Sequence, residues 1–468
     1  MKVKAMNVLP NSLHARDIAY QIHPYTNARK HERTGPVVID RGSGIHVYDD
    51  QGREYIEALA GLWSVAVGFG ESRLVEAAAR QMAKLPYYHT FSHKSHEPSI
   101  ELAEKLVKMS PAGLDHVFFT NSGSEANDTV IKFVWYYNNA IGRERKKKFI
   151  ARNGGYHGIT VAAGSLTGLQ VNQRGFDLPL PFVTHVTCPH HYRFAVEGET
   201  EEAFADRLAA ELEATILAEG PETVAAFIGE PVMGAGGVLV PPRTYWEKVQ
   251  AVCRRYDILV VADEVICGFG RVGTLFACEH FGIRPDILVV SKQITSSYQP
   301  LAAVLISDAI YQGVADQSER LGTFGHGFTG SGHPVATAVG LENLAIIEER
   351  NLVGNAAKVG AHLQARLREF ADHPLVGEVR GVGLIAAVEL VADKASKTKF
   401  DPPGRAGLYL FEKAQEHGLI VRSIQDNIAF CPPLIITEAQ VDEVVARFAR
   451  ALDETQAWVA AGMPTDTR

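Results

Sequence analysis

The chain of 468 residues is 46% hydrophobic and 21% charged, which is typical of a soluble globular protein with two or three domains. Its net charge of −8 gives no electrostatic reason to expect nucleic acid as a partner. No segment approaches the roughly 18 consecutive apolar residues of a membrane-spanning helix, so no membrane association is predicted.

The first 75 residues have a mixed pattern. Residues 1–17 are interrupted by Pro10 and contain too short an apolar run for a secretory signal. The five cysteines are scattered and form no paired framework, which predicts a reducing, cytoplasmic location. The alternating segment at residues 44–59 predicts a β-hairpin that turns around Asp50 and Gly52.

Residues 76–335 are predicted as a large domain in which short apolar runs alternate with amphipathic stretches. Strands are predicted at HVFFT (116–120), KKFIA (147–151), TVAAFIGE (223–230), DILVVADE (257–264), DILVVSK (286–292) and LAAVLIS (301–307). Alternation of strands and helices favours an α/β architecture, with a mostly parallel sheet covered by helices.

Residues 336–468 are predicted as a smaller α+β domain. Two long helical patterns are followed by a strand pair at residues 376–391, and then by another helix and strand. The N-terminal segment, residues 1–75, is expected to join this smaller domain.

Chemically useful side chains end several of the predicted strands. Lys292, Asp263 and Glu230 each follow an apolar run, and ligands of an open parallel sheet bind beyond the carboxyl ends of its strands. A lysine after a buried strand is costly to bury as an ammonium unless its charge is paired or consumed. The strand at 116–120 leads into TNSGSEAN (120–127), where a helix start offers free backbone N–H groups to an anion such as phosphate.

Each of these features also has an ordinary structural explanation. Lys292 could be a strand-end lysine that reaches solvent, Asp263 a helix cap, and Ser122 with Glu125 a capping box. Their joint occurrence at one sheet edge is harder to explain in this way. Pyridoxal 5'-phosphate uses all three groups, because its aldehyde takes a lysine, its pyridine nitrogen a carboxylate and its phosphate a helix N-terminus.

Six ordered segments carry a family resemblance: FFTNSGSEANDTVIK, GGYHG, GEPVMGAGGV, VVADEVICGFGRVG, SKQITSS and GHGFTGSGHPVA. Together they resemble the class III (ω-type) aminotransferases, a branch of the fold type I pyridoxal-phosphate enzymes, over about residues 20–455. The resemblance implies a seven-stranded sheet in the large domain and a homodimer with shared active sites. Pairing of dimers into tetramers stays open.

The resemblance also implies a role for each matching residue. Lys292 would bind the aldehyde and shuttle the proton, and Asp263 would pair with the pyridine nitrogen. The other cofactor positions would be Gly123 and Ser124 at the phosphate, Tyr156 and Val265 on the two ring faces, Glu230 beside Asp263, and Thr329 at the phosphate of the partner subunit.

Substrate positions follow from the pyruvate-dependent amine transaminases of the same family. The pocket wall would consist of Tyr25, Leu62, Trp63, Tyr88, Phe91 and Ile159, and it favours an apolar or aromatic amine. Arg422 would bind the keto-acid carboxylate through two hydrogen bonds and move aside for an uncharged substituent. The chain departs from the family at Gly330, where tyrosine is common, and in the loop after Lys292, which lacks a usual glycine.

The predicted function is ping-pong transamination from an amine or ω-amino acid to a keto acid, with pyruvate as the expected acceptor. The same cofactor residues would also serve a 2-oxoglutarate-dependent aminotransferase, a dialkylglycine-type decarboxylase, a racemase or an aminomutase. GFGRVG (268–273) is a formal dinucleotide fingerprint, but Asp286 begins the next strand instead of ending it, which argues against a dehydrogenase. A non-catalytic binding protein is expected to have lost Lys292 or Asp263. CPHHYR (188–193) has no second cluster to complete a metal site, so none is predicted.

Overall fold

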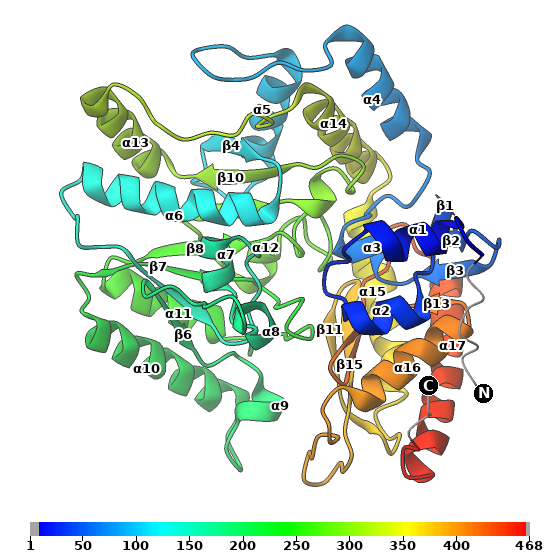
Figure 1. Cartoon of the computed structure of the whole chain (residues 1–468). Coiled ribbons are helices and arrows are strands. Elements are labelled where there is room, and N and C mark those ends of the chain that lie inside the picture. The colour runs from blue at the N-terminus through cyan, green and yellow to red at the C-terminus, as the bar shows by residue number, and fades with distance from the viewer. Residues whose placement is uncertain (1–8, 465–468) are drawn as a thin grey trace.

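The computed structural model describes residues 9–464, and a seven-stranded sheet forms its centre (Figure 1). The strand order is β4-β10-β9-β8-β7-β5-β6. The strands are β4 (His116–Thr120), β5 (Lys148–Arg152), β6 (Val183–Val186), β7 (Val224–Gly229), β8 (Leu259–Asp263), β9 (Ile287–Val290) and β10 (Ala302–Ile306). All six predicted strands are confirmed, and β6 is the strand that the sequence analysis missed.

The central strands are buried on both faces, which explains their continuous apolar runs. Ile287 and Val289 of β9 belong to one hydrophobic core, whereas Leu288 and Val290 belong to another. The first core is covered by α6 (Gly123–Ala140) and α13 (Asp308–Leu321). The second is covered by α10 (Glu201–Glu219) and α11 (Tyr245–Arg255), on the opposite side of the sheet in Figure 1.

The sheet is mixed, because β10 runs antiparallel to both of its neighbours, β9 and β4. The pairs from β6 through β5, β7 and β8 to β9 are parallel, as the alternation of strands and helices predicted. Only residues 291–301 connect β9 to β10, which is too short for the crossover that a parallel pair requires.

Two four-stranded sheets lie beside the central one (Figure 1). The first contains β1 (Ile39–Ser43), β2 (His46–Asp49), β3 (Glu54–Glu57) and β13 (Leu419–Ile420). The second contains β11 (Val376–Val382), β12 (Ile385–Leu390), β15 (Asn427–Phe430) and β14 (Arg422–Ile424).

The predicted hairpin is present, because β2 and β3 pair antiparallel and Asp49 accepts the backbone N–H groups of Gln51 and Arg53 at the turn. Strand β13 pairs with β3, so the N-terminal segment shares a sheet with the C-terminal part of the chain. The domain boundaries at residues 75 and 335 stay predictions.

The remaining helices cover the sheets and connect them. They are α1 (Leu13–Tyr20), α2 (Ala28–Thr34), α3 (Ala60–Trp63), α4 (Ser72–Lys84), α5 (Glu97–Met109), α7 (Val161–Leu166), α8 (Gln170–Gln173), α9 (His191–Phe194), α12 (Ala277–Phe281), the 3₁₀ helix η1 (Lys292–Ile294), α14 (Pro334–Glu349), α15 (Leu352–Arg368), α16 (Arg405–Glu416) and α17 (Glu438–Ala460). Within residues 9–464 no helix is both long and apolar enough to cross a bilayer. The prediction that no secretory signal is present falls partly on residues 1–8, outside the described residues.

Candidate active site

A cavity of about 830 Å³ opens at the carboxyl ends of β7, β8 and β9 and reaches the first turn of α6. Most of the predicted site residues line it: Tyr25, Leu62, Trp63, Gly123, Ser124, Tyr156, Glu230, Asp263, Val265, Lys292 and Arg422. The topological rule for ligand sites in open sheets therefore located this cavity correctly.

Lys292 enters the cavity from a strained backbone position. It begins η1 two residues after the end of β9, with a φ of 48°, in the left-handed region that costs free energy for a residue with a side chain. The buried amide of Asn343 fixes the segment by donating to the carbonyl oxygens of Gln293 (2.8 Å) and Ile294 (3.1 Å). Burial lowers the pKa of the Lys292 ammonium, although Asp263 and Glu230 act in the opposite direction. A neutral amine is thereby favoured where a nucleophile is needed.

Asp263 ends β8 and is held by three hydrogen bonds. One of its carboxylate oxygens lies 2.8 Å from Nδ1 of His157 and accepts the side-chain amide of Asn127 at 2.9 Å. The other accepts the N–H of Val265 at 3.1 Å. Asp263 is 3% exposed, so its carboxylate is fixed in one orientation at the cavity wall.

The neighbours of Asp263 include contacts that the sequence analysis missed. His157 and Asn127 are almost fully buried, and His157 Nε2 and Asn127 Oδ1 have no hydrogen-bond partner among the described residues. Both residues stand inside quoted motifs, GGYHG and SGSEAN. Their contact with Asp263 joins positions more than 100 residues apart in the chain, so only the fold could reveal it.

Two further buried carboxylates follow the strands. Glu230 accepts the N–H groups of Tyr156 (2.9 Å) and Gly234 (3.0 Å), and burial raises its pKa. Glu264 instead accepts the N–H of Cys278 (2.6 Å), and burial raises its pKa to about 7. Glu264 does not line the cavity, so Asp263 is the member of the consecutive acidic pair that can meet a ligand.

The first turn of α6 forms an anion cradle. Ser122 Oγ accepts the N–H of Glu125 and so caps the helix, but the Glu125 carboxylate accepts the N–H of Asn121 instead of that of Ser122, so only half of the capping box considered above is formed. The N–H groups of Gly123 and Ser124 have no acceptor among the described residues. A Cβ at Gly123 would lie 3.3 Å from the Val265 side chain, so glycine keeps this approach open.

Arg422 stands at the substrate side of the cavity. Its guanidinium forms no ion pair with any residue between 9 and 464, and its buried Nε has no partner there. Burial lowers its pKa, while Tyr25 and Tyr156 partly offset this effect. Burial also raises the pKa of Tyr156, and the nearby Tyr25 acts in the same direction. An unpaired, half-buried guanidinium favours an incoming carboxylate.

Four predicted site residues lie outside the lining of this cavity: Tyr88, Phe91, Ile159 and Thr329. Tyr88, Phe91 and Ile159 are 42%, 45% and 62% exposed. The loops that carry Phe91 and Thr329 touch each other, because the Tyr87 hydroxyl donates to the Thr329 carbonyl oxygen at 3.0 Å. A Cβ at Gly330 would lie 2.6 Å from Asn121 Oδ1, so close packing favours glycine at this departure from the family pattern.

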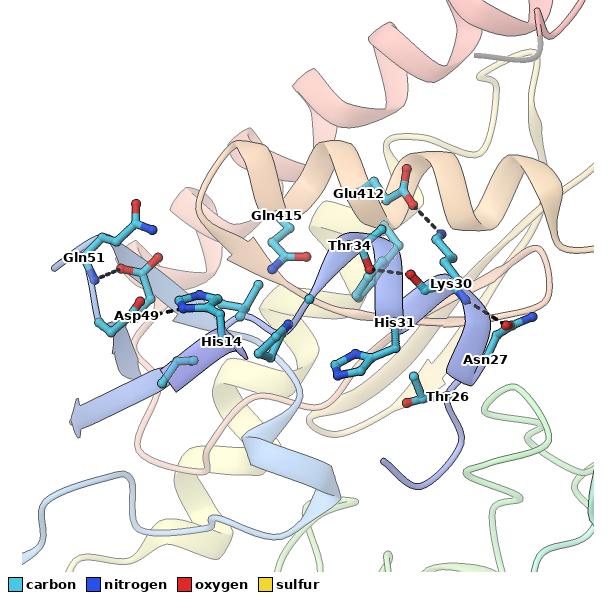
Figure 2. A pocket seen from close by; sticks show the side chains of 16 residues that line it. His14, Thr26, Asn27, Lys30, His31, Thr34, Asp49, Gln51, Glu412 and Gln415 are labelled. Carbon is cyan, nitrogen blue, oxygen red and sulfur yellow. Dashed lines mark hydrogen bonds and ion pairs between the residues drawn. The ribbon is translucent and has the colours of Figure 1, made fainter. Parts of the chain in front are cut away.

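Other polar clusters lie away from the cavity. His190, from the CPHHYR segment, is 2.8 Å from Glu378, but Arg380 pairs with both Glu378 and the nearby Glu389. A separate groove of about 490 Å³ lies between α2, the β2–β3 hairpin and α16, where Lys30 reaches Glu412 at 3.1 Å (Figure 2). It contains none of the predicted site residues.

The cavity residues fit pyridoxal 5'-phosphate. Lys292 offers an amine, Asp263 a fixed carboxylate, and Gly123 and Ser124 free N–H groups for a phosphate, all along one cavity. When bound, this cofactor supplies an aldehyde that captures amines and a ring that accepts electron density.

Comparisons with known proteins agree with this chemistry. The family model for aminotransferase class-III matches residues 26–452. Gamma aminobutyrate transaminase 1, mitochondrial, from Solanum lycopersicum is 49% identical over 92% of this chain and 84% of its own length. Vanillin aminotransferase from Capsicum chinense is 48% identical over 90% of this chain and 92% of its own length. The solved omega transaminase from Pseudomonas jessenii in complex with PMP has a TM-score of 0.95 and 66% identity, and covers 96% of this chain and 100% of its own.

Proposed function

Since the chain belongs to the class-III aminotransferases, which are pyridoxal-phosphate enzymes, we propose that it transfers the amino group of an amine or ω-amino acid to pyruvate. The observation that carries the acceptor assignment is Arg422, whose guanidinium lacks an acidic partner in the cavity that Lys292 enters. An α-keto acid supplies the carboxylate that such a guanidinium binds through two hydrogen bonds.

The proposed mechanism uses one cavity for both half-reactions. Lys292 would hold the cofactor aldehyde, and its Nζ, once free, would accept the proton from the substrate Cα and donate it to the bound cofactor. Asp263, oriented by His157 and Asn127, would keep the pyridine nitrogen protonated. Both substrates would use the space beside Arg422 in turn, so the product of the first must leave before the second binds, as in a ping-pong reaction.

The wall of the cavity supports an apolar or aromatic substituent on the amine. Leu62 and Trp63 line it from one side. An omega transaminase variant described as engineered for enantiopure bulky amines carries substitutions of a tryptophan, a phenylalanine and an arginine. These three residues have the same identities and the same spacing along the chain as Trp63, Phe91 and Arg422. We therefore assign amine size to Trp63 and Phe91, and carboxylate binding to Arg422.

The acceptor assignment predicts a large loss with an acceptor that carries a carboxylate and almost no change with one that does not. In Arg422→Leu, kcat/KM for pyruvate should fall by about 100-fold, because the charge-assisted hydrogen bonds to its carboxylate are lost. Turnover with benzaldehyde, which has no carboxylate, should change by less than about threefold. Steady-state assays with 1-phenylethylamine as donor measure both constants.

A second set of assays separates pyruvate-dependent transamination from the other reactions that the same cofactor residues would serve. Wild-type protein is assayed for alanine formation from pyruvate and for glutamate formation from 2-oxoglutarate, with monoamines, diamines and ω-amino acids as donors. Preference for pyruvate supports the proposal. Preference for 2-oxoglutarate with glutamate as the best donor, or release of CO₂ or an isomer instead of amino transfer, would overturn it.

We also propose a homodimer with shared active sites. Phe91 matches a position that was substituted for bulky amines in the related enzyme, yet it is 45% exposed and lies outside the cavity of its own chain. Thr329 lies on the adjoining loop and is exposed as well. A second copy of the chain that receives these loops at its cavity would account for both positions.

The dimer predicts a solution mass of at least twice the 51.0 kDa of one chain. Sedimentation equilibrium at micromolar concentration, in parallel with activity, is the measurement. An active species of 51.0 kDa would show that the loops with Phe91 and Thr329 are not needed in a second chain's site.

A further inference from the structure

A buried carboxylate that has no part in the proposed mechanism lies behind the cavity wall. Glu57 ends β3 and is 3% exposed. None of the ion pairs within residues 9–464 includes it, and burial without a cation is costly for a carboxylate. Its hydrogen bonds therefore have to compensate for the lost solvation.

The segment that follows Glu57 has an unusual backbone. We call residues 59–63 the wall turn, because Leu62 and Trp63 within it line the cavity. Ala60, Gly61 and Trp63 have φ values of 50°, 67° and 64°. Positive φ costs about 1–3 kcal/mol for a residue with a side chain, so the turn needs external bonds to keep this shape.

Glu57 supplies those bonds. One carboxylate oxygen accepts the N–H of Leu59 at 3.3 Å, and the other accepts the N–H of Gly61. Within the wall turn, Trp63 is 2% exposed and packs into a small core with Leu59, whereas Leu62 is 53% exposed. The position of the apolar wall thus depends on a carboxylate with both of its oxygens engaged.

We propose that Glu57 is a positioning residue for substrate selection, which holds the wall turn against the cavity and so limits the size of the amine. This inference rests on the proposed function, since it assigns the wall to the amine substituent. It adds a residue that touches neither cofactor nor substrate, because Glu57 does not line the cavity.

Protonation of Glu57 should loosen the turn, because a protonated carboxyl group turns one acceptor oxygen into a donor that faces an N–H. Burial raises its pKa to about 7, although the N–H groups of Gly61 and Leu59 lower it. Above this pH the ionised group accepts both N–H groups, and below it one bond is lost.

Among residues 9–464, the titratable or charged groups near Glu57 are the Cys431 thiol and, beyond it, Arg271 and Lys292. The N–H of Cys431 donates to the carbonyl of the adjacent Ala58 at 2.7 Å, and burial raises the pKa of the Cys431 thiol to about 11, so it stays neutral. Beyond Cys431, the guanidinium of Arg271 donates to the carbonyl oxygens of Leu384 and Pro432. Neither Cys431 nor Arg271 changes charge near neutral pH.

The experiment measures the ratio of kcat/KM for naphthylethylamine to that for phenylethylamine. Both amines stay protonated between about pH 6 and pH 8, so their own titration cancels in the ratio. In the wild type the ratio should rise about fivefold as the pH falls through about 7, because the looser wall admits the larger ring. Glu57→Gln, which keeps one acceptor only, should give the raised ratio at every pH.

Asp49→Asn is the matched control, because Asp49 also accepts two turn N–H groups but lies outside the cavity. It should follow the wild type. A wild-type ratio that does not change with pH, or a Glu57→Gln variant that loses activity equally for both amines, would overturn the inference.

A second readout does not depend on turnover. The fluorescence of Trp63, taken as the difference between the wild type and Trp63→Phe, should change over the same pH range. The same difference, measured in a Glu57→Gln background, should not change with pH. Failure of the proposed function would appear instead as no turnover of either amine, with the Trp63 signal still titrating. A Trp63 signal that does not respond to pH would contradict the role of Glu57 whatever the substrate.

Discussion

Replacement of Lys292 by alanine is expected to lower kcat for transamination by at least about 10⁴-fold. In the proposed mechanism the amine serves twice, as the group that binds the cofactor covalently and as the base that moves the Cα proton, and general acid–base catalysis alone contributes about 10²–10⁴-fold. Lys292 lines the cavity from a left-handed backbone position, and burial lowers the pKa of its ammonium.

The loss at Lys292 should affect both half-reactions, and single-turnover spectroscopy with amine alone and with pyruvate alone can separate them. Lys108→Ala is a suitable control, because Lys108 pairs with Glu104 on the exposed face of α5, away from the cavity. It should keep wild-type rates. Substantial turnover by Lys292→Ala would show that another group moves the proton.

The second large effect is expected at Asp263. Asp263→Asn keeps the shape of the side chain but removes its charge, and kcat should fall by about 10²–10³-fold, because a fixed charge that stabilises the transition state is lost. The hydrogen bonds from His157 and Asn127 hold the carboxylate in place before any ligand binds, so little reorganisation energy is spent.

Glu264→Gln provides a neighbouring comparison for Asp263→Asn. Glu264 is equally buried and directly adjacent, but its carboxylate accepts the N–H of Cys278 and faces away from the cavity. Steady-state kcat should change by less than about threefold. Equal losses in the two variants would mean that disturbance of the core, and not the charge at Asp263, accounts for the effect.

The central sheet was largely predictable, because its strands are buried on both faces and appear as apolar runs. Strand β6 was missed, because its four residues, Val183–Val186, include Thr184 and His185 and give only a weak apolar signal. The reversed direction of β10 follows from the short connection after Lys292, a constraint that strand–helix alternation does not express.

The cavity was predictable only in part. Residues at strand ends, such as Lys292 and Asp263, could be placed together by a general rule of open sheets. The bonds of Asp263 to Asn127 and His157 required the three-dimensional structure, because those residues come from different segments. The exposed position of Phe91 could not be deduced either, since its sequence neighbours do not reveal which cavity a loop side chain enters.

The most direct test is to identify the residue to which the cofactor is covalently bound. Holoenzyme is reduced with borohydride, digested, and its peptides are mapped by mass spectrometry. We expect the cofactor to be attached to the amine at position 292 and to no other lysine. Attachment at a different lysine, or a fully active protein from which no modified peptide can be recovered, would contradict it.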